Sequence, residues 1–150
     1  MYLGLLDVLG RTFDAALLLR RARHGPWRAE VAEESMVPTL VPADWLLLDP
    51  TCRRWPRPGS IVVLREPGTG IMAIKRVAAR GRASEGAGGV TSHRLPDGIR
   101  TDLGPREAWV VSDSPDGSVD SRRYGPVDAD DLVARAWFRY GPLRRVGRLR

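Results

Sequence analysis

Two side chains in this sequence can together perform nucleophilic chemistry. The chain carries 24 basic residues, and every one of them except Lys75 is an arginine. Lysine can lose its proton when it is removed from water, whereas arginine effectively cannot. Ser35 lies in a short segment that Pro38 prevents from continuing as a regular helix or central strand. A neutral lysine amine within reach of a serine hydroxyl can accept its proton while the oxygen attacks a carbonyl.

The residues around Lys75 predict a strand with one apolar face. Alternation over residues 71–77 places Lys75 on the same face as Ile71, Ala73 and Val77. Burial on that face disfavours the charged form and lowers the pKa of the lysine. Acting as a base at pH 7 requires a fall of about 3 pH units, or roughly 4 kcal/mol. A second interpretation stays open, in which the lysine stem covers apolar surface while its ammonium group reaches water.

The elements that must position these residues are mostly strands. Short apolar runs separated by proline and glycine predict strands at residues 45–48, 61–64, 71–77, 109–111 and 133–140. Residues 80–106 are rich in glycine and polar residues, which indicates a loop-like insertion. The predicted fold class is mainly β, an antiparallel and partly closed β fold with an N-terminal amphipathic helix.

That helix is predicted at residues 2–20. Asp7, Arg11 and Asp14 form one polar stripe, and apolar residues cover the rest of the helix. The three charges of this stripe argue against a membrane-spanning helix, and the lack of a small-residue cleavage site argues against a secretory signal. The helix therefore either docks on the domain or makes peripheral contact with a membrane. The arginines that follow it favour a cytoplasmic location.

The composition suits one domain and excludes several kinds of site. The chain has 150 residues, of which 43% are hydrophobic and 28% charged, an ordinary globular balance. A single cysteine excludes an internal disulfide framework, and two histidines argue against a multi-histidine metal centre. We therefore expect no metal and no cofactor. The expected organisation is a helix and basic linker over 1–28, a β domain over 29–142 and a basic tail over 143–150.

The net charge of +6 comes entirely from the last residues. The 18 acidic residues all precede residue 135, and the arginines from Arg135 onward supply the whole excess. A basic tail can bind nucleic acid or an anionic membrane. No nucleic-acid-binding motif accompanies it, so we expect a solvated tail and no specific nucleic-acid partner.

Several segments, taken in order, resemble a known enzyme family. The main ones are S-M-V-P-T-L at residues 35–40, K-R-V at 75–77 and D-S-P-D-G-S-V-D-S-R-R-Y-G-P-V at 113–127. With P-A-D-W-L-L-L at 42–48 and R-P-G-S-I-V-V-L at 57–64, they resemble the signal peptidase I family of Ser/Lys endopeptidases. The resemblance covers most of residues 31–140. It implies that Ser35 is the nucleophile and Lys75 the general base.

The resemblance also implies roles for the residues around this dyad. Ser118 would orient the lysine. The lysine strand would be braced by an ion-pair cluster of Arg76, Asp120 and Arg122. The family binds its substrate as an extended strand with small side chains next to the cut. The residues that would line this groove are Val31, Met36, Leu40, Ala73 and Ile74.

The chain departs from the family just before the nucleophile. Glu33 and Glu34 stand where the family has small or small polar residues. At the position of Glu33 some members carry a serine that donates to the oxyanion, which an ionised glutamate cannot do. The backbone N–H of Ser35 remains as a donor, and the loss of one donor typically lowers the rate by about 10²–10³-fold.

A compact branch of the family is similar in size and motifs, namely the proteases that mature nickel-type superoxide dismutase. The resemblance to this branch includes V-P-T-L after Met36 and the A-R-A-W-F-R-Y ending at 134–140. It implies removal of the N-terminal extension of the dismutase precursor.

The alternatives are a conventional membrane-associated signal peptidase that cleaves secretory precursors and an inactive peptide-binding homologue. A self-cleaving repressor would need a DNA-binding motif, which does not precede Ser35. A serine–histidine triad with His24 or His93 has no supporting motif.

Overall fold

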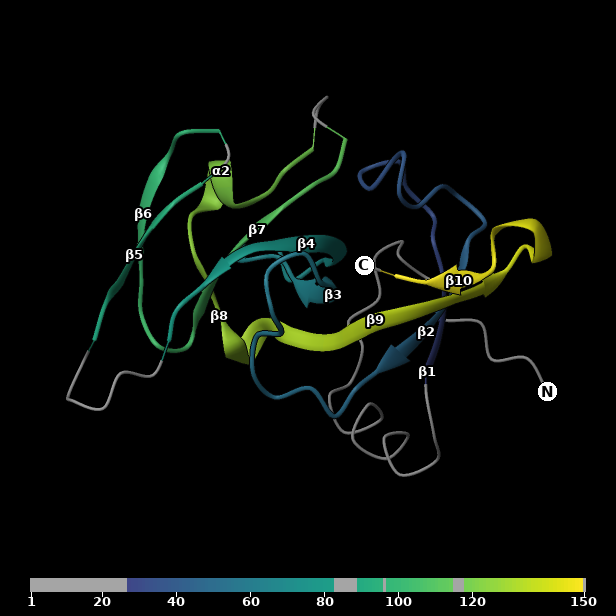
Figure 1. Cartoon of the computed structure of the whole chain (residues 1–150), viewed down its shortest axis with the longest axis horizontal. Coiled ribbons are helices and arrows are strands. Elements are labelled where there is room, and N and C mark those ends of the chain that lie inside the picture. The colour runs from purple at the N-terminus through teal and green to yellow at the C-terminus, as the bar shows by residue number, and fades with distance from the viewer. Residues whose placement is uncertain (1–26, 83–88, 96, 115–117, 150) are drawn as a thin grey trace.

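The regular secondary structure in the described part of the computed structural model of this chain is mainly strands, with few helical residues (Figure 1). The structure describes residues 27–82, 89–95, 97–114 and 118–149. The helix predicted at residues 2–20 and His24 lie outside the described residues. The strands are β1 (Trp27–Glu30), β2 (Trp45–Asp49), β3 (Ile61–Arg65), β4 (Met72–Arg80), β5 (Thr91–Arg94), β6 (Arg100–Leu103), β7 (Glu107–Val111), β8 (Val127–Asp128), β9 (Leu132–Gly141) and β10 (Gly147–Arg148). The short helices are α2 (Ser121–Tyr124), η2 (Ala129–Asp131) and η3 (Leu143–Arg145).

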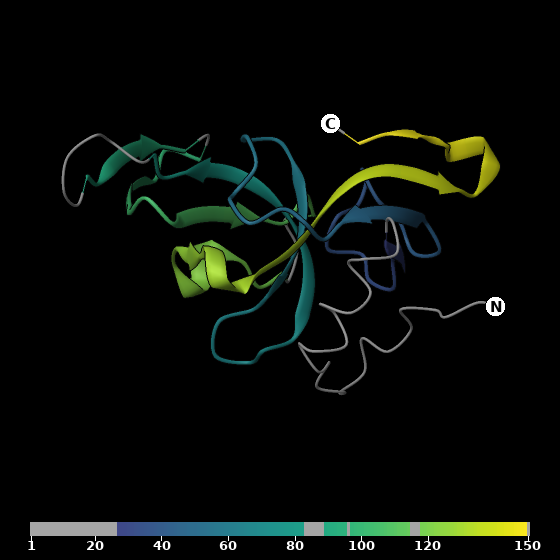
Figure 2. The same ribbon diagram turned by 90° about the horizontal axis from the view of Figure 1, so that it is seen from below.

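The described strands form one large sheet and one small sheet, and every pair in them is antiparallel. The large sheet has the order β1-β2-β9-β3-β4-β7-β8, with β10 added to β9, and β5 pairs with β6 in the small sheet. β9 crosses from the half of the molecule with α2 to the half with β1, β2 and β10 (Figure 2). The prediction of a mainly β, antiparallel fold is therefore confirmed.

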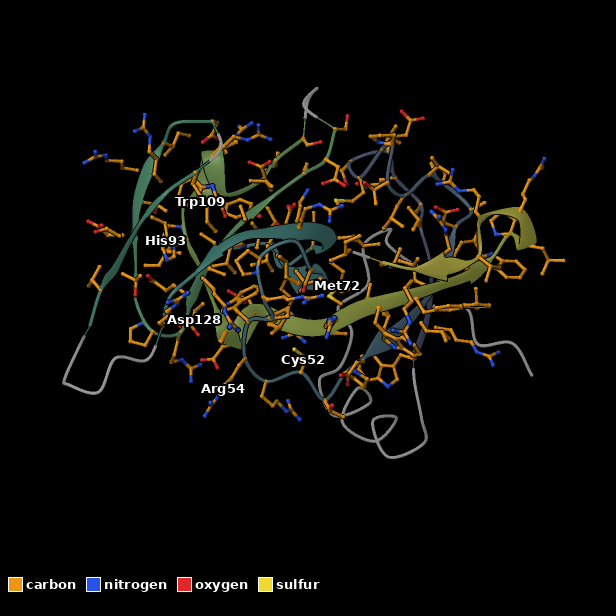
Figure 3. All side chains as sticks on the ribbon, viewed as in Figure 1. Cys52, Arg54, Met72, His93, Trp109 and Asp128 are labelled. Atoms are coloured by element: carbon orange, nitrogen blue, oxygen red, sulfur yellow. The ribbon has the colours of Figure 1, made fainter. Side chains whose placement is uncertain are left out.

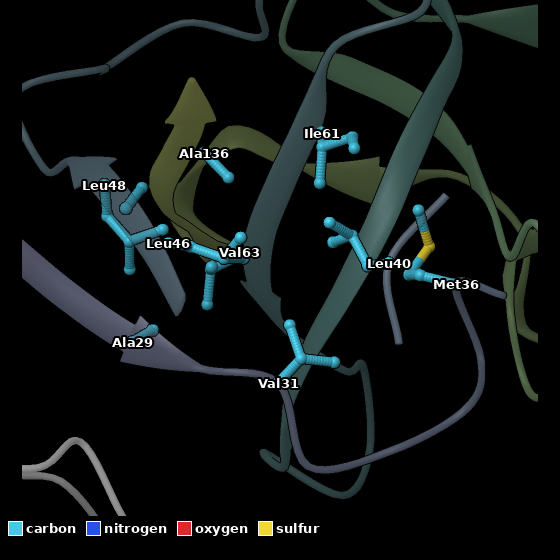
Figure 4. Packing of buried hydrophobic residues seen from close by; sticks show 10 residues of the cluster. Ala29, Val31, Met36, Leu40, Leu46, Leu48, Ile61, Val63 and Ala136 are labelled. Carbon is cyan, nitrogen blue, oxygen red and sulfur yellow. The ribbon is translucent and has the colours of Figure 1, made fainter. Parts of the chain in front are cut away.

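β3 lies at the centre of the fold because both of its faces are buried. Its residues 61–64 are each at most 4% exposed, and such an uninterrupted apolar run is typical of a strand covered on both sides. The first core contains Ala29, Val31, Met36, Leu40, Leu46, Leu48, Ile61, Val63, Ala134 and Ala136 (Figure 4). The second core contains Trp55, Val62, Leu64, Val77, Ala108, Val110 and Val127. β3 pairs with residues 72–76 of β4, and side chains of β4 reach both cores: Met72 and Ile74 pack against the first, and Val77 belongs to the second.

Residues 80–106 are not the structureless insertion that their composition predicts. β5 and β6 form a hairpin inside this range, with Thr91 opposite Leu103. Leu95 and Leu103 pack with Ala79 and Trp109 in a third, small core. A hairpin with one covered face needs only a few apolar residues, so the polar composition concealed it.

The C-terminal residues belong to the fold, contrary to the prediction of a solvated tail. β10 pairs with β9 so that Gly147 lies opposite Arg139, and the Arg145 side chain bonds the carboxylate of Asp44. This arginine-rich stretch has no strand periodicity, so local pattern could not predict its pairing. The N-terminal boundary also differs from the prediction, because β1 begins at Trp27, inside the expected linker.

Asp44 is a fully buried carboxylate that joins the segment before β2 to the C-terminal arginines Arg139 and Arg145. It accepts hydrogen bonds from the Val41 N–H at 3.0 Å, from Arg139 at 3.0 Å and from Arg145 at 3.0 and 3.1 Å. Burial alone would raise the pKa of Asp44, but these hydrogen bonds outweigh burial and hold the pKa below its usual value. The same two arginines donate to the carbonyl oxygen of Thr39, at 2.9 and 3.3 Å. Asp44 thus fixes one end of the segment that carries Ser35.

We predict that Asp44→Asn lowers the free energy of unfolding at pH 7 by roughly 2–3 kcal/mol. This is less than the loss of about 3–5 kcal/mol for a fully buried pair, because the arginines keep some contact with water. A carboxylate whose pKa is depressed by folding stabilises the protein above its unfolded pKa, and loses that effect as the pH falls through its folded pKa. Urea unfolding at several pH values should therefore show the two proteins converging below about pH 4.

The control for this comparison is Asp102→Asn, which removes an exposed acid on β6. It should leave the unfolding free energy nearly unchanged. Equal stability of wild type and Asp44→Asn at pH 7 would show that the Asp44 network contributes nothing to the fold.

Candidate active site

Lys75 is buried among apolar side chains, so the interpretation in which its ammonium group reaches water is wrong. The residue is 3% exposed. Val62 lies directly opposite it on β3, and Val77 follows it on the same face of β4 and is fully buried. Its Nζ donates a 3.0 Å hydrogen bond to Ser112 Oγ and lies 3.9 Å from Glu66 Oε1.

This environment lowers the pKa of Lys75. Removal from water is the largest cause, and the nearby positive charge of Arg122 acts in the same direction. The carboxylates of Glu66, Asp120 and Glu33 oppose the change but do not cancel it. The amine is thus easier to deprotonate than an exposed lysine, which is what a general base requires.

Ser35 lies in a turn that is held by buried residues on its C-terminal side. The Leu40 N–H donates to the Met36 carbonyl at 2.8 Å, and both of these side chains belong to the first core. Ser35 itself is half-buried. The local structure thus agrees with the prediction that this segment is neither a regular helix nor a strand.

Residues 112–114, directly after β7, connect the two candidate catalytic residues. Ser112 Oγ accepts the hydrogen bond from Lys75, and the Ser114 N–H donates to the Ser35 carbonyl at 3.0 Å. Glu33, two residues before Ser35, is also close enough to Lys75 to affect its pKa. The Ser35 segment and the Lys75 amine therefore lie beside the same short stretch of chain. Among the described residues, no hydrogen bond joins the Ser35 hydroxyl directly to the Lys75 amine. The two residues are connected indirectly, because Lys75 bonds Ser112 and Ser35 bonds Ser114.

The predicted ion-pair cluster is divided between two acids. Asp120 pairs with Arg122 at 2.5 Å, as expected, and also accepts the Ser112 N–H at 2.9 Å. Arg76 instead makes a bidentate pair with Asp113, at 2.8 and 2.6 Å. This partner was missed because Arg76 and Asp113 meet only through the pairing of β4 with β7.

Both of these acids have a lowered pKa. For Asp120 and for Asp113, burial alone would raise the pKa, but the hydrogen bonds from their arginine partners and other donors reverse the effect. The two carboxylates therefore stay charged and fix residues 112 and 113, Asp120 through the Ser112 N–H and Asp113 through its pair with Arg76.

Ser112 is the serine that bonds the lysine in the structure, whereas the family resemblance implied that role for Ser118. Ser118 is half-buried, and its role in orienting the lysine stays a prediction. The signal for Ser112 was present in the sequence, since it directly follows a strand-like run that ends at Val111. It could not be recognised without knowing that β7 lies beside β4.

Three of the predicted groove residues are part of the core. Val31, Met36 and Leu40 are 3%, 1% and 0% exposed, so they support the Ser35 turn from beneath and do not line an open groove. Ala73 and Ile74 lie on β4 and are half-buried. These two remain available to a bound chain.

β4 has a backbone edge without a strand partner next to Lys75. β3 pairs with β4 from Met72 onward, whereas β7 pairs with β4 only from Arg76 onward. The Val77 N–H and carbonyl point toward the β3 side, where they bond residues 60 and 59. Because peptide groups alternate along a strand, those of Ile74 point toward the opposite, unpaired edge. In the part of the chain that the structure describes, no strand occupies that edge.

His93 has no structural link to Ser35 in the described residues. It lies on β5 of the small sheet, opposite Thr101. Figure 3 shows His93 well apart from Met72, which begins the strand that carries Lys75. The pairing of Ser35 with His93 gains no support.

The described residues contain no group of three or more histidine, cysteine, aspartate or glutamate side chains arranged to hold a metal ion. The same residues include no helix that is both long and apolar enough to span a bilayer. A comparison with protein-family models finds no match, and neither does a comparison with curated proteins.

We predict that Lys75→Met changes the pH dependence of stability. A lysine whose pKa is lowered by folding destabilises the folded state while it is charged, and this effect disappears as the pH rises through the folded pKa toward the unfolded one. The wild type should therefore gain stability relative to Lys75→Met between pH 7 and pH 11, by about 1.4 kcal/mol for each pH unit that separates the two pKa values. Urea unfolding across this range measures the difference.

At pH 7 the Lys75→Met protein should be no more than about 1 kcal/mol less stable than the wild type, since an apolar side chain of similar length fills the same space. Parallel stability profiles from pH 7 to pH 11 would mean that the Lys75 amine is not desolvated.

Proposed function

We propose that this protein is a Ser/Lys endopeptidase in which Ser35 is the nucleophile and Lys75 the general base. The observation that carries the proposal is a lysine amine buried at 3% exposure and joined through Ser112 and Ser114 to the Ser35 segment. A lysine is rarely buried in this way without a role, because removing its charge from water is costly. Direct hydrogen bonds between catalytic groups are often absent before substrate binds.

In the proposed reaction the neutral Lys75 amine accepts the proton of the Ser35 hydroxyl while Oγ attacks the peptide carbonyl. The ammonium group then returns that proton to the leaving amine as the peptide bond breaks. Water then attacks the acyl-enzyme while the Lys75 amine takes the proton of the water, and the ammonium group returns that proton to Ser35 Oγ as the ester bond breaks. The backbone N–H of Ser35 would donate to the oxyanion, and no hydrogen bond among the described residues uses it.

The unpaired edge of β4 is the proposed substrate site. An extended peptide that adds to this edge would bond the peptide groups of Ile74 and lie next to Lys75. Strand addition supplies affinity through main-chain hydrogen bonds, with specificity from pockets for alternate side chains. Ala73 and Ile74 would then contact the residues before the cut.

The resemblance to the signal peptidase I family supports this assignment and suggests the substrate. On that basis we propose the family's partly closed fold, and a cytoplasmic protease that removes the N-terminal extension of the nickel-type superoxide dismutase precursor. Removal of the extension would free the amino terminus that ligates nickel in the dismutase. Residues 2–20 would provide any contact with a membrane.

We predict that Ser35→Ala, Lys75→Met and Lys75→Arg each lower cleavage of the dismutase precursor by roughly 10³-fold or more, because each removes one member of a unit that acts together. Lys75→Arg is the most informative, since it keeps the charge and the long stem but cannot supply a neutral amine. Mass spectrometry of the precursor's amino terminus follows the reaction.

Ser92→Ala is the matched control for the serine, because Ser92 is exposed on the β5–β6 hairpin. It should cleave at the wild-type rate. Normal cleavage by Lys75→Met would eliminate the dyad. Cleavage of secretory precursors alone would instead assign the protein to the conventional signal peptidases, and precursor binding without cleavage would make it an inactive homologue.

A further inference from the structure

Glu66 places a carboxylate beside the only lysine of the chain. Its Oε1 lies 3.9 Å from Lys75 Nζ, and the two side chains are 14% and 4% exposed. The backbone of Glu66 is fixed at the turn between β3 and β4, where its N–H donates to the Ile71 carbonyl at 2.8 Å and its carbonyl accepts from Gly70 at 2.9 Å. The backbone that carries this carboxylate is therefore fixed by the same hairpin that carries the lysine strand.

The charged groups that face Lys75 come from three different parts of the chain. Glu66 belongs to the β3–β4 turn, Asp120 and Arg122 to the start of α2, and Glu33 to the segment before Ser35. Asp120 is neutralised by Arg122 at 2.5 Å. Glu33 is exposed, so water weakens its effect. Glu66 is thus the acid whose charge acts most directly on the amine.

The uncharged groups around Lys75 and Glu66 do not change the electrostatic effect of Glu66 on the amine. Ser112 accepts the lysine hydrogen bond and carries no charge. Burial raises the pKa of the Tyr124 hydroxyl, and the nearby Glu66 and Asp120 raise it further. Tyr124 therefore remains a neutral phenol near the acids.

We propose that Glu66 is a positioning residue that favours the protonated form of Lys75 in the resting enzyme and thereby raises the pH at which the amine can act as a base. An opposite charge at this distance favours the ammonium form, whereas burial favours the neutral amine. The base becomes active only when its proton leaves to solvent, and Glu66 sets the pH at which this happens. The catalytic consequence rests on the proposed function, but the effect of Glu66 on the lysine proton does not.

The test uses the fact that Lys75 is the only lysine. A protein labelled with ¹³C and ¹⁵N in lysine alone gives one side-chain signal at the ε position, so NMR follows the titration of Lys75 directly. Glu66→Gln keeps the shape of the side chain and removes its charge, and we expect the pKa of Lys75 to fall by about one pH unit or more. Glu66→Asp keeps the charge and should stay closer to the wild type.

Asp102→Asn is the matched control, because it makes the same change in net charge at an exposed position on β6. It should leave the Lys75 titration where it is in the wild type. An unchanged Lys75 titration in Glu66→Gln, or an equal shift in Asp102→Asn, would overturn the inference.

Precursor cleavage provides the second measurement. The acidic limb of the kcat/KM profile should move to lower pH in Glu66→Gln by the same amount as the NMR titration. At a fixed pH on that limb, the rate should rise about tenfold for each pH unit of the change. Absence of cleavage in every variant would contradict the proposed function, and the NMR result would still decide the role of Glu66.

Discussion

The Lys75 amine is held in an apolar layer where water cannot stabilise its charge, and the surrounding structure is arranged around this constraint. The β3–β4 pair places Val62 opposite the lysine, and both faces of β3 are closed by separate cores. Lys75 is 3% exposed although the edge of β4 next to it has no strand partner. The desolvation of the amine therefore comes from the side chains packed around it on the face of the sheet, and a lysine that projected beyond them would reach water with its ammonium group.

Polar groups compensate this burial without removing it. Ser112 gives the amine one hydrogen bond acceptor, and Glu66 gives it a nearby opposite charge. Asp120 fixes the Ser112 backbone and is itself neutralised by Arg122. This arrangement lies between two extremes. A carboxylate in direct contact would hold the Lys75 ammonium group in an inert ion pair, whereas a charged amine without any polar partner would destabilise the fold. An amine between these limits is suited to gain and lose a proton.

The segment that carries Ser35 is fixed by arginines. Arg76 donates to Thr39 Oγ1 at 3.2 Å while it pairs with Asp113, and Arg139 and Arg145 donate to the Thr39 carbonyl. The planar guanidinium group can bond two acceptors at once in a defined geometry, which an ammonium group does less well. The C-terminal residues thereby hold a loop that lies about a hundred positions earlier in the chain.

The sequence by itself determined the features that depend on local pattern. The apolar run at 61–64 predicts a strand, alternation at 71–77 predicts the apolar face of Lys75, and Pro38 excludes a regular element after Ser35. Only the tertiary structure decided the partners of these residues: Ser112 for the lysine, Asp113 for Arg76, and Asp44 for Arg145. It also revealed the β5–β6 hairpin and the role of the C-terminal arginines. The physical reason is that periodicity specifies which side a residue faces, whereas its contacts depend on strand order and register across tens of residues.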